Sequence, residues 1–253
     1  MATSVSTWAE FIAAYQNTDT IIELMADIDC NNNPPTTSIE KPVDKTINGN
    51  GHTIYNISTG AVINSPIFRG AHNLIFNNCN LYNSYRIENQ PIFWSSNTYR
   101  TQFNDCKVTG RGLTHISENC TFQRSSYSWQ GLKAGGKGAA ISLYNTWVKI
   151  EEVRAASTSN AEFGTCVDSY IEGSIGQSFV GANTVKICNN ATDCVINIET
   201  TANSSTPTIG GTTVFNKTKA PNFTDATGFI GVTDEQLKSA VYLQSIGFDI
   251  ITG

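Results

Sequence analysis

The sequence predicts an all-β fold: a parallel β-helix in which short strands stack coil upon coil, with a helix at each end. One observation is a recurring motif of an apolar residue, Asn, a small polar residue or Cys, and another apolar residue, seen at 76–81, 103–108 and 191–196. A second is that Ser-Pro-Ile-Phe at 65–68 returns as Gln-Pro-Ile-Phe at 90–93, 25 residues later. Spacings of this order indicate stacked units, because one short unit cannot bury its own apolar face.

Composition is the third observation. Charged residues make up only 15% of the 253 residues, whereas hydrophobic residues make up 40%. A polar surface must then come from Asn, Thr and Ser, which is typical of long β structures and not of helical bundles. Shorter copies of the motif are expected at 118–122 and 144–148.

The first element that the sequence predicts is a helix. Thr7 and Glu10 have the spacing of a capping box, and an apolar face follows at helical spacing from Trp8 to Tyr15. Residues 17–19 end this helix, and 20–29 read as a strand. A helix with one apolar face ahead of the repeats is expected to cover the open end of a solenoid.

The repeats are expected to start at 46–57, where Asn48-Gly49 and Asn50-Gly51 supply left-handed positions for a tight corner. Strands are expected at 73–81, 98–109, 114–122, 139–152, 163–172, 184–188 and 194–199. Polar loops are expected at 30–37, 125–138, 155–160 and 200–208.

A second capping box, Thr233 with Gln236, predicts a C-terminal helix that ends at Gly247, with a last strand at 248–251. The chain is therefore divided into an N-terminal cap with the first strand (1–29), the β-helix coils (30–232) and a C-terminal cap (233–253).

Charge and cysteine content restrict the partners. A net charge of −5 and a pI near 5.2 argue against nucleic acid, which needs clustered Lys and Arg. No apolar run is long enough to suggest a membrane partner, and 1–6 lacks the features of a secretory leader. Seven Cys, an odd number, are interpreted as free thiols that pack as small apolar groups after synthesis in a reducing cytoplasm.

Both ends resemble a known superfamily. The segment 7–28, a helix followed by a strand of the form apolar-x-Leu-x-x-Asp-Ile, and the first-coil segment 47–54 look like the start of right-handed parallel β-helix proteins of the pectate-lyase-like class. The segment 233–248 resembles the end of phage and bacterial β-solenoid surface proteins. The resemblance implies a right-handed, single-stranded β-helix, and it leaves activity open because this fold hosts lyases, hydrolases, spikes and inert proteins.

The catalytic candidates are Asp105, Asp168 and Asp193, which fall at or near one repeat phase and are expected to stack along one face. Lyases and glycoside hydrolases of this architecture need grouped carboxylates. A structural role at a corner is the competing interpretation, since a repeat phase first fixes structure. The three His lack metal-ligand spacing, so neither a metal nor another cofactor is expected.

Trp94, Tyr99 and Trp129 are the candidate residues for sugar or protein contacts, and Tyr82, Tyr85 and Tyr127 accompany them. All are expected in or near loops, where exposed aromatic side chains bind sugars or form interfaces. The alternative is that they cover the core beneath the loops.

The sequence favours a non-enzymatic structural protein of a bacteriophage virion: a capsid decoration, fibre or tail-associated protein made in the host cytoplasm. Other virion proteins and host surface glycans are its expected partners, and a homo-oligomer, such as a trimer, is expected because solenoid sides are flat. One alternative is a polysaccharide depolymerase, either lyase or glycoside hydrolase. The other is a bacterial adhesin or carbohydrate-binding module.

Overall fold

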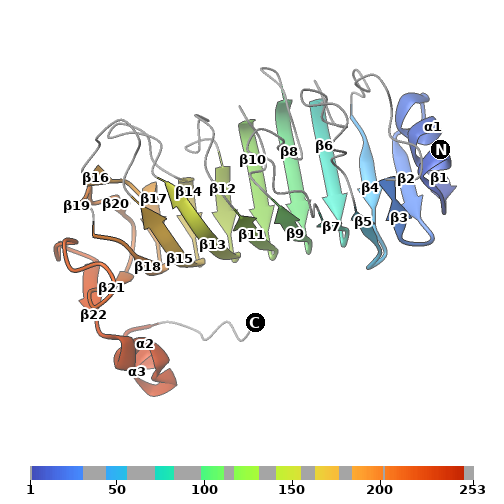
Figure 1. Ribbon diagram of the computed structural model, residues 1–253. Coiled ribbons are helices and arrows are strands. Elements are labelled where there is room, and N and C mark those ends of the chain that lie inside the picture. The colour runs from blue at the N-terminus through green and yellow to red at the C-terminus, as the bar shows by residue number, and fades with distance from the viewer. Residues whose placement is uncertain are drawn as a thin grey trace.

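The computed structural model describes residues 2–30, 44–55, 72–82, 98–110, 117–130, 141–154, 163–176, 184–201 and 203–247. These residues form a parallel β-helix, as the sequence predicts, and Figure 1 shows its strands side by side along one long axis. Successive coils each add one strand to sheet A and one to sheet B, and every pairing within these two sheets is parallel.

Sheet A contains, in spatial order, β1 (Ala2–Val5), β2 (Ile21–Leu24), β4 (Thr46–Asn48), β6 (His72–Asn77), β8 (Thr98–Asn104), β10 (Ser117–Gln123), β12 (Ile141–Tyr144), β14 (Phe163–Val167), β17 (Cys188–Thr192) and β20 (Thr208–Ile209). Sheet B contains β3 (Ile28–Asp29), β5 (Thr53–Tyr55), β7 (Asn80–Tyr82), β9 (Lys107–Gly110), β11 (Ser126–Gln130), β13 (Trp147–Arg154), β15 (Tyr170–Gly176), β18 (Val195–Glu199), β21 (Thr213–Asn216) and β22 (Phe229–Val232). A small third sheet pairs β16 (Thr184–Val185) with β19 (Asn203–Ser204).

A two-residue corner joins the sheet A strand to the sheet B strand in most coils. The long strands predicted at 73–81, 98–109 and 163–172 are therefore wrong in one respect: each is two strands on different sheets. The same correction applies to 20–29 and 139–152. The predicted loop at 125–138 is also wrong over 126–130, which forms β11, while 131–138 lies outside the described residues.

The N-terminal end is closed by α1 (Trp8–Gln16). The predicted capping box is confirmed, with Thr7 accepting from the Glu10 amide and Glu10 accepting from the Thr7 amide. Trp8, Phe11 and Tyr15 are buried, so the helix covers the apolar end of the core. The prediction missed β1, which precedes this helix and pairs with β2.

A buried lysine fixes α1 to the first coils. Lys45, only 3% exposed, donates from Nζ to the carbonyls of Ala14 (2.9 Å) and Asn17 (2.7 Å), and also to the carbonyl of Asp19. Carbonyl groups at a helix C-terminus lack intrahelical partners, so a cation is favourable there. Lys45 comes directly before β4, so these hydrogen bonds tie the end of α1 to β4.

Ring stacking continues the core from coil to coil. The ring centroids of Phe76 and Phe103 are 5.2 Å apart, those of Phe103 and Phe122 are 4.7 Å apart, and Tyr127 stacks on Phe122 at 5.2 Å. Each of these side chains is at most 2% exposed. Tyr127 therefore belongs to the core, and its predicted placement in or near a loop is wrong.

The C-terminal end carries α2 (Asp234–Lys238) and α3 (Ala240–Ser245) in place of the single predicted helix. Ser239 ends the first and caps the second, and Gly247 follows with φ of 92°. Leu243 packs in a small separate core with Val195, Val214 and Val232 of sheet B. The predicted last strand at 248–251 lies outside the described residues. No helix in the described part of the chain is long and apolar enough to cross a membrane.

Candidate functional site

One column of exposed polar residues runs along the tight corners between the sheets. Its members, named here the corner column, have left-handed backbone conformations with φ between 43° and 54°: Asn50, Asn78, Asp105, Arg124, Asn145, Asp168 and Asp193. Asn and Asp adopt this conformation more readily than other non-glycine residues. The repeating Asn or Asp of the sequence motif is thus explained by the backbone at the corner.

A buried small residue follows each member of the corner column from Asn78 onwards. Ser125 accepts a hydrogen bond from the Cys106 amide (3.0 Å) and donates to the Gln123 carbonyl (2.9 Å), and Ser169 acts likewise on the Thr146 amide and the Val167 carbonyl. A hydroxyl or thiol here supplies partners for backbone groups that turn out of the strand ladder. The corner motif is therefore a structural device in each coil.

The structure places all three predicted carboxylates, Asp105, Asp168 and Asp193, in the corner column, and all three are exposed. Asp168 and Asp193 belong to neighbouring coils, because the preceding residues Val167 and Thr192 are paired. Asp105 is three coils from Asp168, about 14 Å at the usual strand spacing. The three carboxylates therefore do not converge, and their catalytic role stays a prediction.

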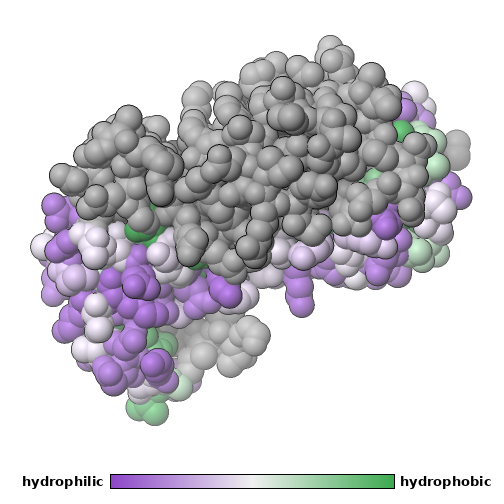
Figure 2. Space-filling view, in the orientation of Figure 1, coloured by the Kyte–Doolittle hydropathy of each residue, from purple (hydrophilic) through white to green (hydrophobic). Residues whose placement is uncertain are grey.

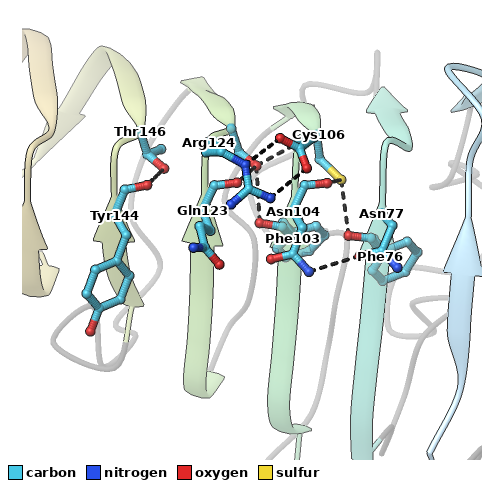
Figure 3. Close-up of polar contacts among 11 residues, drawn as sticks. Phe76, Asn77, Phe103, Asn104, Cys106, Gln123, Arg124, Tyr144 and Thr146 are labelled. Carbon is cyan, nitrogen blue, oxygen red and sulfur yellow. Dashed lines mark hydrogen bonds and ion pairs between the residues drawn. The ribbon is translucent and has the colours of Figure 1, made fainter.

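Asp105 also has a cationic partner of its own. Arg124 donates to its two carboxylate oxygens at 2.7 and 2.8 Å (Figure 3). These hydrogen bonds lower the pKa of Asp105, so its carboxylate stays ionised and paired rather than acting as a proton donor. Within the described ranges, no group of three or more His, Cys, Asp or Glu side chains is placed to hold a metal ion.

The outer face of the ten-stranded sheet A lies beside the corner column. Two rows of side chains, aligned by the strand register, point outward from it. The row next to the corner is Glu23, Asn48, Asn77, Asn104, Gln123, Tyr144, Val167 and Thr192. The second row is Ile21, Thr46, Ile75, Gln102, Thr121, Ser142, Thr165, Asn190 and Thr208. Glu23 is the one charged side chain in these two rows.

Amide groups hold the first row in place. Asn48 donates to Glu23 (2.6 Å), Asn77 donates to Asn48 (3.0 Å), and Asn104 donates to Asn77 (2.9 Å). Figure 3 shows the bond between Asn77 and Asn104, with Gln123 and Tyr144 on the next strands. Each amide bridges adjacent coils, so the face is held in one arrangement before any ligand arrives.

The predicted aromatic contacts are only partly visible. Trp94 lies outside the described residues. Tyr99 and Trp129 each lie one position inside an end of strands β8 and β11, and their contacts stay a prediction. The prediction missed Tyr144 and Trp147, whose side chains are 38% and 37% exposed on sheets A and B. Both residues flank Asn145-Thr146, which is a copy of the corner motif, and this position is the sequence signal that could have identified them.

Polar residues cover most of the described surface that is visible in Figure 2. Figure 2 shows mostly hydrophilic residues over the C-terminal coils, with a hydrophobic patch on the C-terminal helices. Val241 of α3 is 78% exposed there. Single exposed apolar residues are common on soluble surfaces and assign no site by themselves.

Comparison with known proteins supports the architecture. Residues 2–122, close to half of the chain, match the family described as a putative pectate lyase-like adhesive domain. No curated protein and no solved structure matches the chain. Together with the parallel strand order, the match shows a pectate-lyase-like β-helix fold, and its description points to an adhesin-like protein.

Proposed function

We propose that this chain is a non-enzymatic attachment module whose outer sheet A face adheres to a hydroxyl-rich surface. The observation that carries the proposal is the pair of outward rows from β4 onwards, which present mainly amides and hydroxyls, with Ile75 and Val167 as apolar members and no charged side chain. Uncharged donors and acceptors cost less to desolvate than ions, so such a face suits polar, neutral ligands. The match to an adhesive domain supports the same class of function.

Rigidity strengthens the argument. The amides of Asn48, Asn77 and Asn104 are already bonded in register, and the core beneath them is stacked. A pre-formed face loses little conformational freedom on binding. Similar groups recur at each strand, about 4.8 Å apart, so many weak contacts act together along an extended ligand.

The proposal also names the particle on which the module is displayed. We place it on the surface of a bacteriophage virion, as a capsid decoration, fibre or tail-associated protein. There it would contact other virion proteins and host glycans, with a homo-oligomer, such as a trimer, as the working form. The elongated β-helix supports this because a rigid rod displays its faces at a distance from the particle. Immunogold labelling of particles and of bacterial cells distinguishes a virion from a cellular location.

A matched pair of variants tests the attachment face. Thr121→Arg puts a charge on the outer face of sheet A, and Ser126→Arg puts the same charge in the same coil on sheet B. Both residues are half-buried in strands, so the two substitutions are expected to destabilise the fold to a similar degree. Binding to immobilised bacterial envelopes is measured by interferometry, while the bound polysaccharide is analysed for new chain ends.

The expected result is that Thr121→Arg loses attachment, Ser126→Arg keeps it, and the polysaccharide retains its length. Equal binding by the two variants would remove sheet A from the proposal. A shortened polysaccharide with unsaturated or new reducing ends would favour a depolymerase and direct mutagenesis to Asp168 and Asp193.

A further inference from the structure

A hollow of about 320 Å³ lies on the outer face of sheet A near its N-terminal end. Asp44, Thr46, Asn73, Ile75 and Gln102 line it. They come from β4, β6, β8 and the residue that lies two positions before β4. Binding sites for small ligands start at about 300 Å³, so the hollow has room for one sugar ring with its substituents.

Two residues at the edge of the hollow depart from strand geometry. Asp44 and Asn73 both have left-handed backbones, with φ of 58° and 54°, and the Asn73 amide donates to the Asp44 carboxylate at 2.6 Å. Non-glycine residues in this conformation carry a local energetic cost and gather at functional sites. A carboxylate accepts about four hydrogen bonds, and Asn73 uses one of them.

The floor of the hollow has a different character. Ile75 points outward between Thr46 and Gln102, on a face whose second row is otherwise largely polar. It is half-buried, and Gln102 beside it is exposed. An apolar floor with amide, hydroxyl and carboxylate groups around it matches a sugar ring, which has C–H groups on its faces and hydroxyls at its edge.

We propose that this hollow binds one ring of a neutral oligosaccharide. Ile75 packs against the ring face, while Asp44, Asn73 and Gln102 exchange hydrogen bonds with hydroxyls. Among the described residues that line the hollow, Asp44 is the one with a charge, and the chain carries a net charge of −5, so an acidic sugar is repelled. This inference rests on the proposed attachment function and names its ligand class.

Calorimetric titration with hexasaccharides tests the inference. The probes are the neutral cellohexaose, mannohexaose and N-acetylated chitohexaose, and the acidic hexagalacturonate. At least one neutral probe is expected to bind, with hexagalacturonate at least tenfold weaker. Gln102→Ala is expected to weaken the neutral probe about tenfold, the effect of losing a well-placed hydrogen bond.

Gln244→Ala is the matched control, because Gln244 is an exposed glutamine on α3, outside sheet A. It should leave neutral binding unchanged. Asp44→Asn keeps the shape of the side chain and removes its charge, so it should narrow the gap between neutral and acidic probes. The inference is overturned if no neutral probe binds, if hexagalacturonate binds as tightly, or if Gln102→Ala and Gln244→Ala behave alike.

The outcomes also separate the inference from the function on which it rests. If Thr121→Arg abolishes attachment to envelopes while Gln102→Ala binds neutral probes like the unchanged chain, only the hollow is wrong. If the unchanged chain attaches to no envelope at all, the attachment function itself is wrong.

Discussion

Replacing Phe103 by Ala should remove the centre of the stacked core. Its ring is fully buried between Phe76 and Phe122, with centroids 5.2 and 4.7 Å away. Truncating a buried Phe to Ala costs about 3–5 kcal/mol of unfolding free energy. The stacked neighbours place the expected value in the upper half of that range, since each aromatic pair adds about 0.5–1.5 kcal/mol.

The assay is urea unfolding followed by circular dichroism, with Gln102→Ala as the control. Gln102 is the preceding residue and points outward, so its truncation should cost less than about 0.5 kcal/mol, as is usual for a surface site. Because each coil contacts only its neighbours, Phe103→Ala is also expected to separate unfolding of the two ends into distinct steps. A loss below about 1 kcal/mol for Phe103→Ala would refute the strand register on which the outer face is based.

Three further predictions concern the backbone, the corner ion pair and the thiols. Gly173→Ala should strongly lower the melting temperature, because Gly173 has φ of 126° and an added Cβ would lie 1.8 Å from the Ile150 carbonyl oxygen. Gly51 also has a positive φ but faces open space, so Gly51→Ala should lower the melting temperature less. Arg124 lowers the pKa of Asp105, so the pair stabilises the fold at pH values above the ordinary carboxyl pKa of 3.8, and this contribution should disappear as the pH falls through the lowered pKa. Asp105→Asn should therefore flatten that part of a profile of melting temperature against pH, by a small amount because the pair is exposed. Burial raises the pKa of Cys106 to about 11 and that of Cys194 to about 12, so both should resist iodoacetamide at pH 8 until denaturant is added, whereas labelling of the native protein within minutes would contradict their burial.

The sequence predicts the structure best where a local backbone conformation favours one residue type. The left-handed corner predicted at Asn50-Gly51 is confirmed, because Asn and Gly suit that conformation, whereas Asn48-Gly49 does not adopt it. Arg124 occupies the corner position of its coil and gives no such signal, so the motif at 118–122 was placed in the wrong phase. It lies entirely within β10 and has no corner. The buried small residue after the corner was recognised when it was Cys and missed when it was Ser125.

The outer face needed information that the sequence does not carry. Corner residues are 27 positions apart from Asn78 to Asp105 but 19 apart from Asp105 to Arg124, so coil length varies along the chain. Without a constant period, the alignment of Gln102 with Thr121 and of Asn104 with Gln123 follows only from the strand pairing. Both outward rows depend on such alignments, whereas the two capping boxes are local and were predicted directly.

Hydroxyl-radical footprinting of the chain on and off an immobilised bacterial envelope tests the central claim most directly. Tyr144 and Trp147 are matched reporters, 38% and 37% exposed, on the outer faces of sheets A and B. The account predicts that attachment protects Tyr144 from oxidation and leaves Trp147 as reactive as in the free chain. Protection of Trp147 alone, or of neither residue while the chain is bound, would contradict attachment through sheet A.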